Sequence, residues 1–219
     1  MAIAVSETVK KIGNVDFEIT YNCNLNCLHC YNPKTLRSDE LSTSQILKVI
    51  DEIKEAGFKE IHITGGEPCL HKDIISILKY ADKLGLNILL ETNATILPNV
   101  SDLKDIKNLT IRASIEGYAK IHNVVRKSNL DDAYMQSINN LVKAQNSGIT
   151  VQTTTSVNQI NYKFIKDMVR DLVNHKLTNI RLRLSMPAGN ALKNWNDIKL
   201  TNEQYTIVRK QMNLSGLKA

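Results

Sequence analysis

The sequence predicts an α/β fold, a partial (β/α)6 TIM-like barrel of parallel strands in a single domain. Strand-like runs alternate with amphipathic helical patterns along most of the 219 residues, which favours parallel strands joined by right-handed crossovers. There are six such units, whereas eight close a complete barrel. The length allows one sizeable core and argues against a second full domain. Functional residues are therefore expected on the rim formed by the carboxyl ends of the strands.

The six strands are expected at residues 15–20, 60–64, 87–92, 108–114, 150–156 and 179–184. Apolar residues at helical spacing predict helices at about 43–56, 74–84, 101–106, 131–147, 162–175 and 201–212. Ser42 and Gln45 form a predicted capping box at the start of the first helix. The glycines expected to end three of the helices are Gly57, Gly85 and Gly148. Residues 15–200 should form the domain, with an N-terminal extension at 1–14 and a C-terminal helix and tail at 201–219.

Composition excludes several classes of partner. The formal charge is +6, but the lysines are spread along the predicted helices as solvated faces. The seven Tyr, three Phe and one Trp show no alternation with basic residues that would stack nucleic-acid bases. No run approaches the roughly 20 apolar residues that span a bilayer, and the start lacks a signal-peptide layout. We therefore expect a cytoplasmic protein with neither a membrane nor a nucleic-acid partner.

Three of the four cysteines, Cys23, Cys27 and Cys30, form a C-x3-C-x2-C loop after the first strand. Three thiolates on one loop can bind three corners of a cubane cluster and leave the fourth iron open, as a catalytic site requires. A zinc site completed by His29 or another histidine, and a redox dithiol, are the alternatives. Cys69 is interpreted as a small hydrophobic residue.

A second motif, Gly65-Gly66-Glu67-Pro68, follows the second strand directly. Its glycines permit close approach to a backbone edge, whose carbonyls can accept hydrogen bonds from an ammonium group, and Glu67 can add a negative charge. Alone, the motif could equally be a simple turn.

The segment 23–31, CNLNCLHCY, resembles the signature loop of the radical S-adenosylmethionine (radical SAM) enzymes, C-x3-C-x-aromatic-C. The resemblance implies that Cys23, Cys27 and Cys30 hold a [4Fe–4S] cluster and that S-adenosylmethionine chelates the open iron. It also implies reductive cleavage to a 5′-deoxyadenosyl radical that abstracts hydrogen from a substrate. His29 stands where the family has an aromatic residue near the adenine.

Other strand ends are similar to those of peptide-modifying members of the family. Residues 65–68 match the GGE motif for the methionyl amino group, and Asn93 lies in a T-N-G-T-like turn with alanine in place of glycine. Ser114 opens an S-x-D-G-like motif with glutamate for aspartate, and Arg126 belongs to an H-D-x-x-R-G-like motif. In such relatives the serine and the arginine reach the S-adenosylmethionine carboxylate. Ser114 could instead simply end a strand, and Arg126 could be a surface residue.

The resemblance spans about residues 15–189 and implies an enzyme, with a peptide or protein as the substrate and a flavodoxin- or ferredoxin-type low-potential electron donor. No cysteine follows Cys69, so the cysteine-rich SPASM or twitch extension of those enzymes is not expected in this sequence. The alternatives are an enzyme that acts on a small metabolite and a non-catalytic iron–sulfur or zinc scaffold. The similarity assigns no catalytic side chain.

Overall fold

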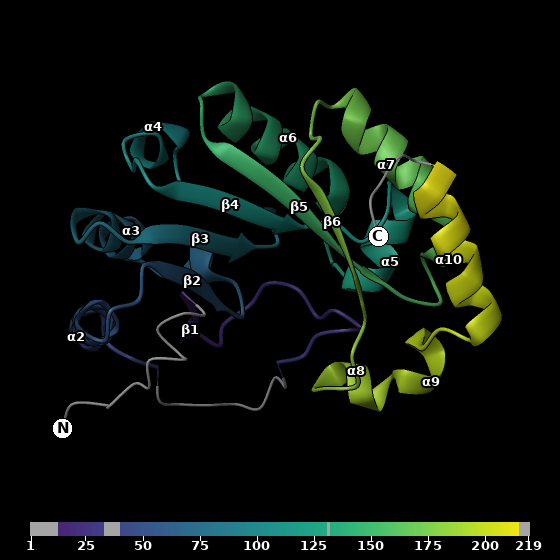
Figure 1. The fold of residues 1–219 in the computed structure, drawn as a ribbon, viewed down its shortest axis with the longest axis horizontal. Helices are drawn as coiled ribbons and strands as arrows, with labels where there is room; N and C mark the ends of the chain where they lie inside the picture. The colour runs from purple at the N-terminus through teal and green to yellow at the C-terminus, as the bar shows by residue number, and fades with distance from the viewer. Residues whose placement is uncertain (1–12, 33–39, 131, 215–219) are drawn as a thin grey trace.

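A computed structural model describes residues 13–32, 40–130 and 132–214 of the chain. It contains a six-stranded sheet in which each strand pairs in parallel with the next, in the order β1 to β6 (Figure 1). The strands are β1 (Asn14–Thr20), β2 (Glu60–Gly65), β3 (Asn87–Thr92), β4 (Leu109–Ser114), β5 (Thr150–Val157) and β6 (Ile180–Leu184). All six expected strands are confirmed, each to within one residue at either end.

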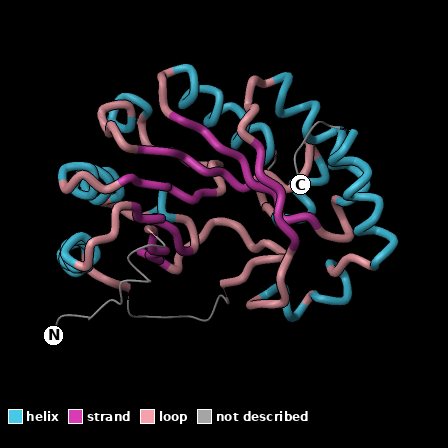
Figure 2. Tube along the Cα trace, viewed as in Figure 1, coloured by secondary structure: helices cyan, strands magenta, loops and turns pink. Residues whose placement is uncertain are grey.

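Helices lie along the outer side of the curved sheet (Figures 1 and 2). Those that were predicted are α2 (Thr43–Glu55), α3 (Ile74–Lys83), α4 (Val100–Leu103), α6 (Ala133–Asn146), α7 (Ile165–Asn174) and α10 (Asn202–Leu214). The structure adds α5 (Lys120–Arg126), α8 (Asn190–Lys193), α9 (Trp195–Ile198) and the 3-10 turns η1 (Pro68–Leu70) and η2 (Tyr162–Phe164). These additional elements are too short to show a helical period. The predicted start of α6 at residue 131 lies outside the described residues.

The strand register explains why one face of the sheet is apolar and buried against the helices. Residues that pair across parallel strands share a face, so Ile61, Ile88 and Leu109 point the same way, toward the helices. The apolar stripe of α2 packs there through Ile46 and Ile50, both fully buried. The opposite, concave face carries mostly polar side chains.

The capping box and the terminating glycine predicted for α2 are also confirmed. Ser42 accepts a hydrogen bond from the backbone of Gln45, whose side chain caps Ser42 in return. At the other end, Gly57 has a φ of 90°, which favours glycine.

Within the described residues β1 and β6 do not pair, so the sheet is an open partial barrel, as predicted. No helix in that part of the chain is long and apolar enough to cross a membrane.

Candidate functional site

The carboxyl ends of the strands and the loop after β1 surround a cavity of about 240 Å³. The sequence predicts eleven site residues, and nine of them line this cavity: Cys23, Cys27, His29, Cys30, Gly65, Gly66, Asn93, Ser114 and Arg126. Ser156 of β5, Arg183 of β6 and Met186 just after β6 also line the cavity. The parallel sheet therefore brings motifs from across the sequence to one rim.

The two glycines of the second motif hold the start of the cysteine loop. Gly66 N donates to the Thr20 carbonyl at 2.7 Å, and Glu67 N donates to the Asn22 carbonyl at 2.7 Å. A Cβ on Gly66 would lie 2.3 Å from the Asn22 oxygen, and one on Gly65 would lie 2.2 Å from the Thr20 oxygen. Only glycine permits this approach, so Gly65 accommodates the end of β1 and Gly66 accommodates the start of the cysteine loop.

Segments distant in sequence hold the rest of that loop. Leu28 N donates to the Val125 carbonyl in α5 at 3.0 Å, and Ala191 N in α8 donates to the Cys30 carbonyl at 3.2 Å. Gly189 has a φ of 55°, and a Cβ there would meet the Tyr31 carbonyl oxygen at 2.1 Å. The loop is thus clamped between β2, α5 and α8. Sequence reasoning missed the contribution of Gly189, although its place after the last strand was a signal.

Glu67 does not line the cavity, contrary to the role that we expected for it. Its carboxylate is fully buried and accepts hydrogen bonds from Cys69 N at 3.0 Å, Thr92 Oγ1 at 2.7 Å and Asn93 N at 2.7 Å. Burial raises the pKa of this carboxyl, and the three donors oppose that rise. Glu67 therefore ties the turn after β2 to the turn after β3. Pro68 is likewise buried, at the start of η1, outside the cavity.

Asn93 lines the cavity and links two loops. Its side-chain amide donates to Asn24 Oδ1 in the cysteine loop at 2.9 Å, and its own Oδ1 accepts from Thr95 N at 2.9 Å. The next residue, Ala94, has a φ of 57° in the left-handed region, where the similar family turn has glycine. The turn keeps the glycine-like conformation even though it contains alanine.

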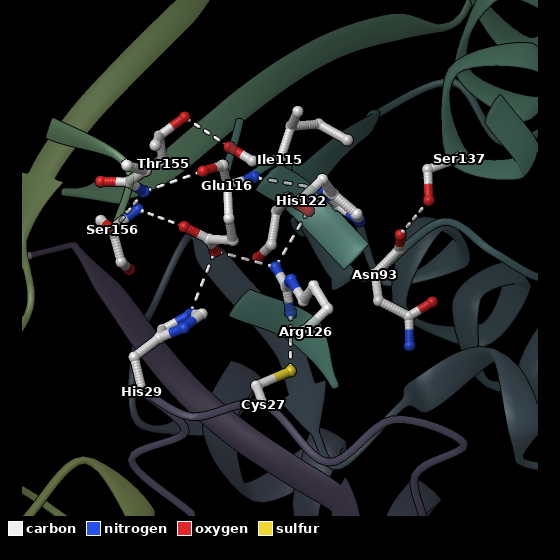
Figure 3. A network of polar contacts seen from close by, with 12 residues as sticks. Cys27, His29, Asn93, Ile115, Glu116, His122, Arg126, Ser137, Thr155 and Ser156 are labelled. Carbon is white, nitrogen blue, oxygen red and sulfur yellow. Dashed lines mark hydrogen bonds and ion pairs between the residues drawn. The ribbon is translucent and has the colours of Figure 1, made fainter. Parts of the chain in front are cut away.

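A buried network joins the cysteine loop to β4, β5 and α5 (Figure 3). Glu116, which is 1% exposed, accepts from Arg126 Nη2 at 3.0 Å and from Ser156 N at 2.8 Å, and its Oε1 lies 3.1 Å from His29 Nε2. Arg126 also donates to Cys27 Sγ at 3.3 Å and to the Ser114 carbonyl at 2.9 Å. Sequence reasoning missed Glu116 as the centre of this network. A carboxylate two residues after a strand-end serine was the available signal.

The electrostatics of the network follow from its contacts. Burial by itself would raise the pKa of Glu116, but the charges of His29 and Arg126 lower it to about 2. Burial likewise disfavours the charged form of Arg126, and Cys27 and Glu116 outweigh it and raise the pKa of the guanidinium. Glu116 and Arg126 therefore both remain charged. The alternative that Arg126 is a surface residue is wrong, because it is 7% exposed.

His122 supports the same network as a neutral side chain. Its Nδ1 accepts from Glu116 N at 3.2 Å. Burial, followed by the charge of Arg126, lowers the pKa of His122 to about 3. The imidazole is therefore an uncharged acceptor for the backbone of β4's end.

All four cysteines lie within the described residues, and none of them forms a disulfide. Burial and the neighbouring Cys27 raise the pKa of Cys30. Cys69 packs against the hydrophobic core and donates to Thr92 Oγ1 at 3.6 Å, away from the cavity. In the described part of the chain, no three or more His, Cys, Asp and Glu side chains are grouped so that they could hold a single metal ion. His29, which a zinc site would use, is instead paired with Glu116.

Several known proteins have sequences that align with most of this chain. The AdoMet-dependent heme synthase of Oleidesulfovibrio alaskensis is 28% identical over 196 residues, which are 87% of this chain and 50% of that protein. The mycofactocin maturase MftC of Mycolicibacterium smegmatis is 29% identical over 198 residues, covering 86% of this chain and 48% of the maturase. The chain thus spans about half the length of these relatives.

The fold is also found in solved structures. Streptococcus suis SuiB bound to S-adenosylmethionine superimposes with a TM-score of 0.76 at 16% identity, covering 92% of this chain and 48% of SuiB. At this identity the likeness concerns the fold alone.

The sequence model of the Radical SAM superfamily matches residues 17–172. This range is more than half of the chain, and it includes the cysteine loop, both glycines of the second motif and Arg126. The chain belongs to the radical SAM superfamily.

Proposed function

We propose that this chain binds a [4Fe–4S] cluster through Cys23, Cys27 and Cys30 and binds S-adenosylmethionine beside it. When both are bound and a donor supplies one electron, reductive cleavage of S-adenosylmethionine would give methionine and a 5′-deoxyadenosyl radical able to abstract hydrogen from a substrate. The observation that carries the proposal is that three cysteine side chains of one loop, none of them in a disulfide, line the same cavity as the Gly65–Gly66 strand end. Thiolates are the ligands that iron–sulfur clusters use.

The other residues of the cavity suit a charged nucleoside ligand. Gly65 and Gly66 contribute backbone to the lining of the cavity, and Ser114 offers a hydroxyl for a carboxylate. Arg126 lines the same cavity with a guanidinium that stays charged. These residues would hold and orient S-adenosylmethionine against the cysteine loop.

A peptide or protein is the proposed substrate. The mycofactocin maturase and the PqqA peptide cyclase of Bradyrhizobium diazoefficiens, 36% identical over 104 residues, carry names that point to peptide modification. The cavity mouth also exposes large apolar side chains: Tyr31, Leu184 and Met186 are 48%, 49% and 74% exposed. Exposed apolar groups beside a cavity favour contact with a partner chain. A low-potential electron donor of the flavodoxin or ferredoxin type is proposed as the second partner.

A small-molecule substrate is the second candidate, favoured by the match of the heme synthase to 87% of this chain. Product analysis with two kinds of substrate separates the candidates. The mass of a short precursor peptide encoded beside the gene should change during turnover, while an iron porphyrin, the class of compound to which heme belongs, should remain unchanged. The opposite result would favour the second candidate.

The proposal is tested by cluster assembly and cofactor cleavage. After anaerobic reconstitution with iron and sulfide, the protein should show cluster absorbance. With S-adenosylmethionine and dithionite it should release 5′-deoxyadenosine and methionine. The change Cys27→Ala should abolish both signals, and Cys69→Ala, in the cysteine outside the cavity, should keep both. Cleavage that survives Cys27→Ala, or a purified protein that takes up zinc and no iron, would refute the assignment.

A further inference from the structure

Arg126 contacts a predicted cluster ligand directly. Its Nη1 donates a hydrogen bond to Cys27 Sγ at 3.3 Å, although the two residues are 99 positions apart in the sequence (Figure 3). Both residues are 7% exposed, so water screens this contact little. The contact places the positive charge of the guanidinium within hydrogen-bond distance of that sulfur.

The guanidinium is held in place by acceptors other than the sulfur. Its Nη2 donates to Glu116 Oε1 at 3.0 Å and to the Ser114 carbonyl at 2.9 Å. Glu116 is in turn fixed by Ser156 N at 2.8 Å and by His29 at 3.1 Å. Because Ser114 at the end of β4 and Ser156 in β5 supply backbone anchors for Arg126 and Glu116, the sheet itself directs the N–H group at Cys27.

We propose that Arg126 and Glu116 set the reduction potential of the cluster bound by Cys27, and this inference rests on the proposed function. Reduction adds one electron, taken from a low-potential donor, and makes the cluster with its thiolates more negative. A cationic N–H donor stabilises that added charge, and Glu116 partly offsets it, since hydrogen bonds to sulfur and net charge both tune such potentials. Arg126 should therefore raise the potential, and Glu116 should lower it.

This makes Arg126 and Glu116 positioning and tuning residues of the cysteine loop. It also gives Arg126 a second task, in addition to the contact with the S-adenosylmethionine carboxylate that family resemblance implies. The distinction can be measured without S-adenosylmethionine.

The test is a redox titration of the reconstituted protein with dithionite, in which the reduced cluster is followed by electron paramagnetic resonance. Arg126→Gln removes the positive charge beside Cys27. The equilibrium constant for reduction should fall about tenfold, a shift of about 59 mV to more negative potential for one electron. The matched control is Arg112→Gln, because Arg112 forms a half-buried pair with Glu91 at 2.9 Å and bonds to Gln152. In this control variant the reduction potential of the cluster should stay close to that of the wild type.

Glu116→Gln should shift the reduction potential of the cluster in the opposite direction. The glutamine oxygen can still accept from Arg126, while the negative charge is gone, so the potential should become more positive. A merely structural role would move both variants in the same direction by loosening the loop. Should Arg126→Gln fail to fold, Arg126→Lys keeps the charge but loses the fork that bridges Cys27 and Glu116, and it should shift the potential in the same negative direction by less.

Two failures can be told apart. If the wild-type protein assembles no cluster, the proposed function is wrong. If the cluster forms with wild-type iron content and the potentials of the Arg126 and Glu116 variants are unchanged, or shift in the same direction, the tuning role is wrong and the function stands.

Discussion

The close approach between Gly66 and the cysteine loop predicts a severe effect for Gly66→Ala. The new Cβ would lie 2.3 Å from the Asn22 carbonyl oxygen and 2.6 Å from that of Tyr21, both of which are backbone atoms that cannot rotate away. Either the loop or the end of β2 must move. Movement would lengthen the two hydrogen bonds that join them, from Gly66 N to Thr20 and from Glu67 N to Asn22.

The magnitude follows from these contacts. Forcing an extra methyl group into a packed site costs about 1–3 kcal/mol. Weakening two backbone hydrogen bonds costs about 0.5–1.5 kcal/mol each. Gly66→Ala should therefore lower the free energy of unfolding by about 2–6 kcal/mol. Because the displaced segment carries Cys23, iron uptake should fall as well.

The assay is urea unfolding of the protein without iron, followed by measurement of iron bound after reconstitution. Gly148→Ala is the matched control. Gly148 has a φ of 88° but open space around its Cβ position, so alanine there meets backbone strain and no clash. That strain costs about 1–2 kcal/mol, partly offset by the lower entropy of the unfolded chain. The control should lose about 1 kcal/mol and keep its iron.

The comparison can refute the steric argument. If Gly66→Ala loses no more stability than Gly148→Ala and binds iron normally, the loop does not depend on the close approach. The glycine would then be explained by a ligand rather than by the protein's own backbone.

Three further changes test other parts of the fold. The pKa of His122 is about 3 in the folded protein against an ordinary 6.5, so the unfolded chain binds more protons between these values and stability falls as the pH is lowered through that window. Between pH 6.5 and 5 this loss is about 2 kcal/mol. His122→Asn keeps an acceptor for Glu116 N and should flatten the dependence of the unfolding free energy on pH, measured by urea unfolding across that range. An unchanged dependence would contradict the assignment. Ser137 Oγ donates to the buried Asn93 carbonyl at 2.8 Å, so Ser137→Ala should cost about 1–3 kcal/mol in the same assay, and a loss below about 0.5 kcal/mol would show that the bond contributes little. Ser42→Ala removes the cap of α2 and should cost about 1 kcal/mol by thermal unfolding; an unchanged midpoint would contradict the capping role.

Much of the fold could be predicted because its signals are local. Short strand-like runs between helical patterns placed the six strands, and apolar residues at helical spacing placed the buried faces of α2, α3 and α6. The helix α5 was not predicted, because seven residues are too few to show a period. Its first turn follows Ala119 with a φ of 44°, a conformation that the surrounding structure imposes.

Part of the site could also be predicted, because it depends on where the strands end. Parallel strands deliver their carboxyl ends to one edge, so motifs at strand ends must converge, and Gly65, Gly66 and the cysteines do line one cavity. The direction of individual side chains could not be predicted in the same way. Glu67 turns into the protein, because three donors of the β2 and β3 turns satisfy its carboxylate there.

The sequence by itself determined the parallel α/β architecture, the rim on which function lies and the three thiols on one loop, because these depend on periodicity and short spacings. Only the tertiary structure decided that Glu116 gathers His29 and Arg126 and that Arg126 meets Cys27. Such contacts join residues up to 99 positions apart. They depend on the packing of side chains against one another, which no local pattern encodes.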